Sequence, residues 1–209
     1  LAAVKMEVGR SNLPDINFLK QVRDLTSKKK IILIFDECTS GFRRNLGGLH
    51  LTTGVNPDMA MFGKALGNGY AITSVIGKYS IMKKAEKSFI SSTFWTESIG
   101  PTAALKTIEI MEKKKSWKYI TNLGVYIKKN WIKLAKKHKL KIKVQGISAL
   151  CAFNFKSKYH QAYRTYITQE MLKKGILATT TIYVSTSHTD KVLNIYFSRV
   201  MLIQVLMKI

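Results

Sequence analysis

The chain has 209 residues, 46% of them hydrophobic, which is enough to bury a substantial core in one or two domains. Cys38 and Cys151 are its only cysteines, so a disulfide framework is excluded. No run of about 20 apolar residues occurs, and the four histidines are dispersed. We therefore expect no transmembrane helix and no metal site, and a cytoplasmic location is the default expectation.

The net charge of +23 has two explanations. Such an excess is typical of proteins that bind nucleic acid or an anionic membrane surface. However, 29 of the 35 basic residues are lysines, and they are spread along the chain. Nucleic-acid readers favour arginine, because its guanidinium makes paired contacts with bases. The pattern favours a lysine-biased surface, with nucleic-acid binding as the alternative.

The first third of the chain alternates between predicted strands and a helix. A strand is expected near residues 2–8, and Asp15 is placed to cap a helix over residues 16–27. The apolar run 31–35 is rich in β-branched residues, which predicts a strand buried on both faces, as in a parallel sheet. The expected buried stripe of the helix contains Phe18, Val22 and Leu25.

The middle of the chain continues the alternation. Residues 58–62 predict the next strand, and residues 71–76 form another apolar segment. Pro101 fits the first turn of a helix that runs to about residue 114. A second, longer helix is indicated by apolar residues at helical spacing: Ile120, Leu123, Ile127 and Leu134.

The pattern changes near residue 141 and predicts a small α+β domain. Residues 141–144 and 149–155 indicate strands on either side of Gly146, with Cys151, Phe153 and Phe155 on one face. A helix ending near Gly175, two short strands and a last helix from about Thr189 complete it. The stripe of the first of these helices consists of Tyr159, Ala162, Tyr163, Tyr166 and Ile167. We place the domains at residues 1–138 and 139–209.

Asp36 and Lys64 are the strongest candidates for chemistry. Asp36 closes a predicted buried strand, and ligands of α/β proteins bind at the carboxyl ends of strands. Lys64 is flanked by Gly63, Gly67 and Gly69, which allow close backbone approach to a ligand. Taken singly, Asp36 is more often a cap or turn residue, and Lys64 a solvated loop charge. Together they match a pyridoxal phosphate site, in which a lysine forms a Schiff base and a carboxylate keeps the pyridine nitrogen protonated.

Three segments resemble the class III aminotransferases. Residues 33–43, LIFDECTSGFR, are similar to the aspartate motif of that family. Residues 57–69, PDMAMFGKALGNG, are similar to its lysine motif, and residues 92–95, STFW, to the segment that follows. Within the family the likeness is strongest to the glutamate-1-semialdehyde aminomutase group, and it runs from about Ala2 to about Asn194.

The resemblance implies a fold and a set of roles. The fold is α/β: part of the large domain of a fold-type I transferase with a mostly parallel sheet, followed by a small α+β domain. Lys64 matches the catalytic Schiff-base lysine, and Asp36 the partner of the pyridinium nitrogen. Cys38 matches a position that packs under the ring, where the family usually has an aliphatic residue; ordinary core packing is equally plausible. Thr93 matches a threonine that crosses a homodimer to the partner's cofactor phosphate, although it also suits the start of a turn.

The resemblance also implies that this chain is a carboxyl-terminal half. Family members are about twice as long, and their amino-terminal half carries a glycine-rich phosphate loop that has no counterpart here. We therefore expect the isolated chain to be inactive and its parent to be an enzyme acting on a small amino donor and acceptor, either as an aminomutase or as an intermolecular aminotransferase. The alternatives are an inactive remnant or dimerisation partner of the same fold, and a basic nucleic-acid-binding module.

Overall fold

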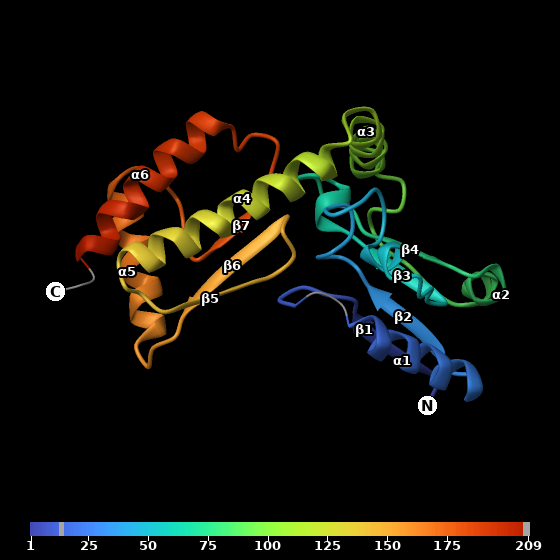
Figure 1. Ribbon diagram of the computed structural model, residues 1–209. Coiled ribbons are helices and arrows are strands. Elements are labelled where there is room, and N and C mark those ends of the chain that lie inside the picture. Colours follow the sequence, from blue (N-terminus) through green and yellow to red (C-terminus); the bar gives the residue numbers. More distant parts are fainter. Residues whose placement is uncertain (13–14, 207–209) are drawn as a thin grey trace. The chain divides into compact units, whose positions relative to one another are not determined.

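The structure is a computed structural model that describes residues 1–12 and 15–206, of which residues 201–206 are described by their backbone alone. Contacts within the chain divide it into two compact units, Leu1–Lys118 and Tyr119–Ile209. Figure 1 shows the elements of both. Each unit is described by itself.

The first unit contains a four-stranded, mostly parallel sheet. Its strands lie in the order β1-β2-β3-β4; β1, β2 and β3 are parallel, and β4 is antiparallel to β3. The strands are β1 (Ala3–Glu7), β2 (Ile32–Asp36), β3 (Met59–Phe62) and β4 (Ser74–Gly77). The helices are α1 (Ile16–Lys28), α2 (Tyr79–Met82), α3 (Ile99–Lys114) and three short 3₁₀ turns, η1 (Leu49–Thr52), η2 (Lys64–Leu66) and η3 (Lys83–Lys87). The parallel arrangement confirms the predicted fold class.

Helix α1 confirms the predicted cap but not the predicted stripe. Asp15 Oδ1 accepts hydrogen bonds from two backbone N–H groups of the first turn, at 3.0 and 3.1 Å. The buried positions are Leu19 and Thr26, whereas Phe18 is 52% and Leu25 58% exposed. The core stripe therefore lies one residue further along the helix. Thr26 can be buried because its hydroxyl donates to carbonyl oxygens of its own helix, at 2.8 and 3.0 Å.

Strand β2 is buried on one face only, so the prediction of burial on both faces was wrong for the residues described. Leu33 and Phe35 are fully buried, whereas Ile32 and Ile34, on the opposite face, are half-buried. The alternating pattern shows that helices and loops of the first unit cover one side of the sheet more completely than the other.

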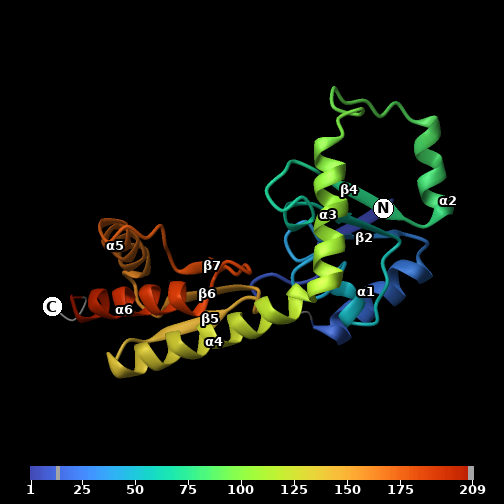
Figure 2. The same cartoon turned by 90° about the horizontal axis from the view of Figure 1, so that it is seen from above.

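The second unit packs helices against a three-stranded antiparallel sheet with the order β5-β6-β7. Figure 2 shows α4 and α6 side by side, and the Trp131 indole of α4 donates to the Tyr196 hydroxyl of α6 at 3.0 Å. Cys151, Phe153 and Phe155 are buried together, as predicted. The elements are α4 (Ser116–Lys137), β5 (Ile142–Gln145), β6 (Leu150–Phe155), α5 (His160–Lys173), β7 (Thr181–Tyr183) and α6 (Asp190–Leu206).

Two details of the second unit differ from expectation. Only one short strand, β7, follows α5 in the described residues, and residues 176–180 before it are not part of a strand. The stripe of α5 is buried at Ile167 and Met171, half-buried at Tyr163 and Tyr166, and exposed at Tyr159.

The contacts group almost all of α4 with the second unit, whereas the predicted boundary after residue 138 placed this helix in the first domain. Its buried side chains Leu123, Ile127 and Trp131 belong to the core of the second unit. The assignment of residues 1–138 to a cofactor-binding domain and 139–209 to a small domain remains a prediction.

Candidate active site

Two neighbouring parallel strands carry the predicted catalytic pair at the same edge of the sheet. Asp36 is the last residue of β2 and lies in register with Met61 of β3, and Lys64 follows β3 directly after Gly63. Cys38 is close to both groups, since its thiol interacts electrostatically with the Asp36 carboxylate and with the Lys64 ammonium. The structure thus brings these three predicted site residues together.

Lys64 stands in a tight turn with an unusual backbone. Its φ of 48° lies in the left-handed region, which costs energy for a residue with a side chain and is common at functional sites. The turn is closed by Leu66 N–H donating to Gly63 O at 3.0 Å and Asn68 N–H donating to Lys64 O at 3.1 Å. The Lys64 side chain is exposed, and its Nζ donates to the Thr39 hydroxyl at 2.7 Å.

Thr39 is therefore a site residue that the sequence reasoning missed. It is buried, and its hydroxyl accepts the hydrogen bond from the lysine amine. The sequence feature that could have identified Thr39 is its position, three residues after Asp36 inside the aspartate motif.

The Asp36 carboxylate is held from two sides. Its Oδ2 lies 3.0 Å from Lys5 Nζ on β1, and its Oδ1 accepts the Cys38 N–H at 3.1 Å. The hydrogen bond from Lys5 is the largest influence on the pKa of Asp36, and with the Cys38 contacts it outweighs burial and lowers that pKa. Asp36 is therefore ionised at neutral pH, the state required to accept an N–H from a pyridine ring.

Cys38 is partly buried and keeps its proton. Burial and the neighbouring Asp36 carboxylate raise the pKa of the thiol, and the Lys64 ammonium only partly offsets this. A neutral thiol is a small, polarizable packing group. It suits contact with an aromatic ring better than nucleophilic chemistry.

Glu37 has a structural role. It is completely buried and accepts four hydrogen bonds: from the Ser40 hydroxyl (2.8 Å), Leu49 N–H (2.6 Å), His50 N–H (2.8 Å) and His50 Nδ1 (2.7 Å). Burial alone would raise the pKa of Glu37, but these hydrogen bonds, led by His50, lower it. A carboxylate has about four acceptor positions. All are used here, so Glu37 has none left for a cofactor hydroxyl, and it fixes the loop over residues 37–50.

Thr93 comes from a different part of the first unit. It is exposed, in a turn on the connection between η3 and α3. A contact with a partner's cofactor involves a second chain, so this role remains a prediction.

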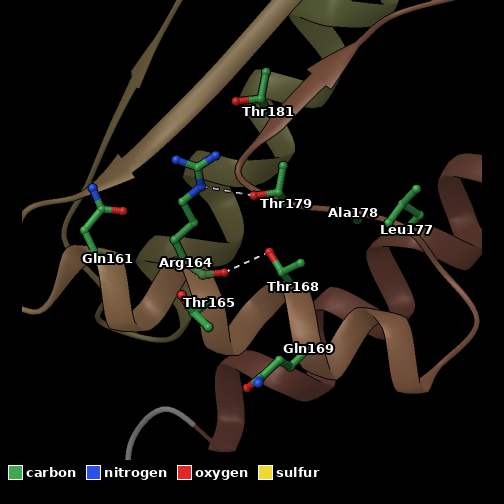
Figure 3. Close-up of a pocket in the computed structure, with 9 residues that line it drawn as sticks. All are labelled: Gln161, Arg164, Thr165, Thr168, Gln169, Leu177, Ala178, Thr179 and Thr181. Atoms are coloured by element: carbon green, nitrogen blue, oxygen red, sulfur yellow. Dashed lines mark hydrogen bonds between the residues drawn. The ribbon is translucent and has the colours of Figure 1, made fainter.

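A separate hollow in the second unit has no obvious chemistry. Its volume is about 540 Å³, and Arg164 is the one ionisable side chain among the residues that line it (Figure 3). Arg164 Nε donates weakly to the Thr179 hydroxyl at 3.4 Å, and the Thr168 hydroxyl donates to Arg164 O at 3.0 Å. The lining residues include no carboxylic acid, thiol, imidazole or amine side chain, and none of them is a predicted site residue.

The donor set at the sheet edge fits pyridoxal phosphate. An ionised carboxylate, a packing thiol and an exposed amine share one edge, where bound rings meet the carboxyl ends of parallel strands. No group of three or more His, Cys, Asp or Glu side chains with the placement of metal ligands occurs among the described residues. In the same part of the chain, none of the helices has the length and apolar character needed to cross a membrane.

Comparison with known proteins agrees with this chemistry. The family model described as aminotransferase class-III matches residues 2–191. The 3-aminobutyryl-CoA aminotransferase of Cloacimonas acidaminovorans is 48% identical over a stretch that covers 49% of this chain and 25% of that protein. A glutamate-1-semialdehyde 2,1-aminomutase of Polynucleobacter asymbioticus is 29% identical over 93% of this chain and 50% of its own length.

A solved structure shows the same fold. FumI of Sphingopyxis sp. MTA144, determined in its PLP internal aldimine form, superposes with a TM-score of 0.91 at 19% identity. The match covers 97% of this chain and 51% of FumI.

The fold is the one seen in FumI, and the family model matches residues 2–191, so this chain belongs to the class III aminotransferase family. It spans about half the length of these relatives or less.

Proposed function

We propose that the protein carrying this chain transfers amino groups with pyridoxal phosphate. The observation that carries the proposal is the meeting of Asp36, Cys38 and Lys64 at one edge of the sheet, with Asp36 held ionised. When bound, pyridoxal phosphate supplies an electron sink that stabilises negative charge on the substrate carbon.

Each residue of the candidate site has its own role in the proposed reaction. Asp36 holds the proton on the ring nitrogen, and the neutral Cys38 thiol packs against the ring. Lys64 would hold the cofactor through Nζ, and as a free amine it would take up and return a proton at the substrate carbon. The Thr39 hydroxyl, 2.7 Å from Lys64 Nζ, gives the released amine a fixed resting position.

The assembly belongs to the same proposal. We expect a homodimer in the cytoplasm, in which Thr93 of each protomer reaches the cofactor phosphate of the other. Support comes from the neighbours of Thr93: Phe94 is 75% and Trp95 64% exposed, apolar surface that a partner can cover. The substrate is a small amino donor or acceptor rather than nucleic acid.

The relatives represent two possible reaction types. One is an intramolecular aminomutase acting on glutamate-1-semialdehyde, and the other an intermolecular aminotransferase. We expect the part of such proteins that this chain does not match to contribute to substrate choice in either case. We expect residues 1–209 alone to hold the cofactor poorly and to show no activity.

The test is amino transfer by the protein carrying this chain. It is incubated with pyridoxal phosphate and an amino donor, and conversion of the cofactor to its amine form is followed by absorbance. We expect conversion in the parent protein, its loss in Lys64→Ala, and retention in Lys20→Ala, a variant of an exposed lysine on α1. Conversion at an equal rate in Lys64→Ala would contradict the proposal, and no conversion in any of them would favour an inactive member of the family.

A further inference from the structure

A row of charges crosses from β1 to β2 at the edge that carries the candidate site. Glu7 of β1 is in register with Asp36 of β2, so two acidic residues stand on neighbouring strands, whose backbones lie about 4.8 Å apart. Lys5 lies two residues before Glu7, on the same face of the sheet, because side chains alternate along a strand. Its Nζ reaches Asp36 Oδ2 at 3.0 Å.

We propose that Lys5 is a positioning residue of the cofactor site, which holds the Asp36 carboxylate ionised and turned toward the ring nitrogen. This inference rests on the proposed function. Lys5 does not touch the reacting atoms; it acts through Asp36.

The geometry fixes the orientation of the carboxylate. Lys5 binds Oδ2 from β1, and the Cys38 backbone N–H binds Oδ1 from the loop after β2. The Cys38 thiol also contacts the carboxylate. A carboxylate has about four acceptor positions, so these three contacts leave one for an N–H of the ring. Lys5 can therefore stay in place when the cofactor binds.

The charges explain why a cation is needed at this point. Glu7 is in register with Asp36 on the neighbouring strand, so both acidic residues at this place carry the same formal charge. Among the described residues, the cations that act on Asp36 and Cys38 are Lys5 and Lys64. Lys64 donates to Thr39, which leaves Lys5 as the direct partner of Asp36.

The pair contributes little to stability. The Lys5 side chain is 53% exposed and the Asp36 side chain 24% exposed. Ion pairs in such surroundings stabilise folded proteins only slightly. A role for Lys5 is therefore better sought in the protonation and orientation of Asp36 than in the free energy of unfolding.

The first test needs no cofactor. In the protein labelled with ¹³C at aspartate carboxyl groups, the pKa of Asp36 is measured by NMR for the parent, Lys5→Met and Lys5→Arg, with Lys20→Met as the matched control on α1. We expect the pKa of Asp36 to rise in Lys5→Met and to stay low in Lys5→Arg and Lys20→Met. An unchanged pKa in Lys5→Met overturns the proposal, whether or not the protein transfers amino groups.

The second test uses pyridoxal phosphate itself. Asp36 accepts the ring N–H only when ionised, so binding weakens as pH falls through its pKa. We expect the acid limb of the binding profile to move to higher pH in Lys5→Met and to return in Lys5→Arg. Tighter binding in Lys5→Met at neutral pH would show that Lys5 competes with the ring, and this too contradicts the proposal. Circular dichroism at each pH verifies folding, and Lys5→Gln replaces Lys5→Met if the latter unfolds.

Discussion

At the scale of single residues, the number of filled acceptor positions distinguishes a structural carboxylate from one that can bind a ligand. Glu37 is completely buried with every acceptor position filled, whereas Asp36 keeps a position for a ligand. The sequence predicted Asp36 and Lys64 as a pair because a strand-ending acid and a glycine-flanked lysine form a specific pattern. It did not predict Thr39 or Lys5, because a threonine in a loop and a lysine in a chain of charge +23 carry no signal until the fold places them.

Glu37→Gln tests the structural role of the buried carboxylate. Loss of the charge weakens four hydrogen bonds and leaves a buried donor without a suitable acceptor. We expect the free energy of unfolding to fall by about 2–4 kcal/mol. Hydrogen exchange of the Leu49 and His50 amides measures this locally, because both donate to Glu37. The exposed Glu112→Gln of α3 is the control, and we expect it to leave both amides unchanged. Equal protection in Glu37→Gln and the parent protein would contradict the assignment.

The same group gives a pH dependence. The pKa of Glu37 is lower in the folded chain than its ordinary value of 4.5. The unfolded chain therefore binds the proton more tightly, and the stabilisation by Glu37 is complete above about pH 5 and is lost as pH falls through the folded-state pKa. We expect protection of the Leu49 amide, corrected for intrinsic exchange, to decrease below pH 4.5 in the parent and to change less in Glu37→Gln.

At the scale of elements, the periodicity of apolar residues predicted which segments are helices and strands better than which faces are buried. The core stripe of α1 passes through Leu19 and Thr26 rather than Phe18 and Leu25. Hydropathy favours phenylalanine over threonine at a buried position. Thr26 can nevertheless be buried, because its hydroxyl donates hydrogen bonds to carbonyl oxygens of its own helix. In α4 the predicted stripe is correct, because its apolar positions Ile120, Leu123 and Ile127 all pack in the core of the second unit.

Gly124 in α4 shows a constraint that periodicity does not reveal. A Cβ built at this position would lie 1.7 Å from the Ser148 carbonyl oxygen, so the helix approaches the turn before β6 too closely for any side chain. Gly→Ala in a helix ordinarily stabilises by roughly 0.5–1 kcal/mol. We expect the opposite here: Gly124→Ala destabilises the second unit by about 3 kcal/mol or more, since backbone must move.

Urea unfolding followed by tryptophan fluorescence, to which the core residue Trp131 of the same unit contributes, measures this change. Lys129→Ala, at an exposed position of the same helix, is the control and should stay within about 0.5 kcal/mol. A stabilised Gly124→Ala would show that the close approach is absent.

At the scale of the whole molecule, the fold class and the family were predictable because residues 33–43 and 57–69 resemble two motifs of that family. The sequence does not indicate which compact unit α4 packs into, because a helix between two regions has apolar residues whichever core it joins, and the domain boundary after residue 138 remains a prediction. Only the contacts that α4 makes in the folded chain show that it packs in the second unit.

The net charge of +23 also belongs to this scale. If it reflects surface composition, binding to duplex DNA at physiological salt should be no tighter than about 1 μM, within the ordinary non-specific range. Fluorescence anisotropy with a labelled duplex, repeated from about 50 to about 200 mM salt, measures this. Submicromolar affinity at physiological salt, with a steep salt dependence, would favour the nucleic-acid alternative.

The central claim is that Lys64 and Asp36 form one cofactor site. The protein carrying this chain is incubated with pyridoxal phosphate, reduced with borohydride to fix any imine, digested and mapped by mass spectrometry. We expect the adduct to concentrate on Lys64, and its yield there to fall in Asp36→Asn but not in the control Asp24→Asn on the exposed side of α1. An adduct spread evenly over the exposed lysines, with Lys64 no more modified than Lys20, would contradict the account.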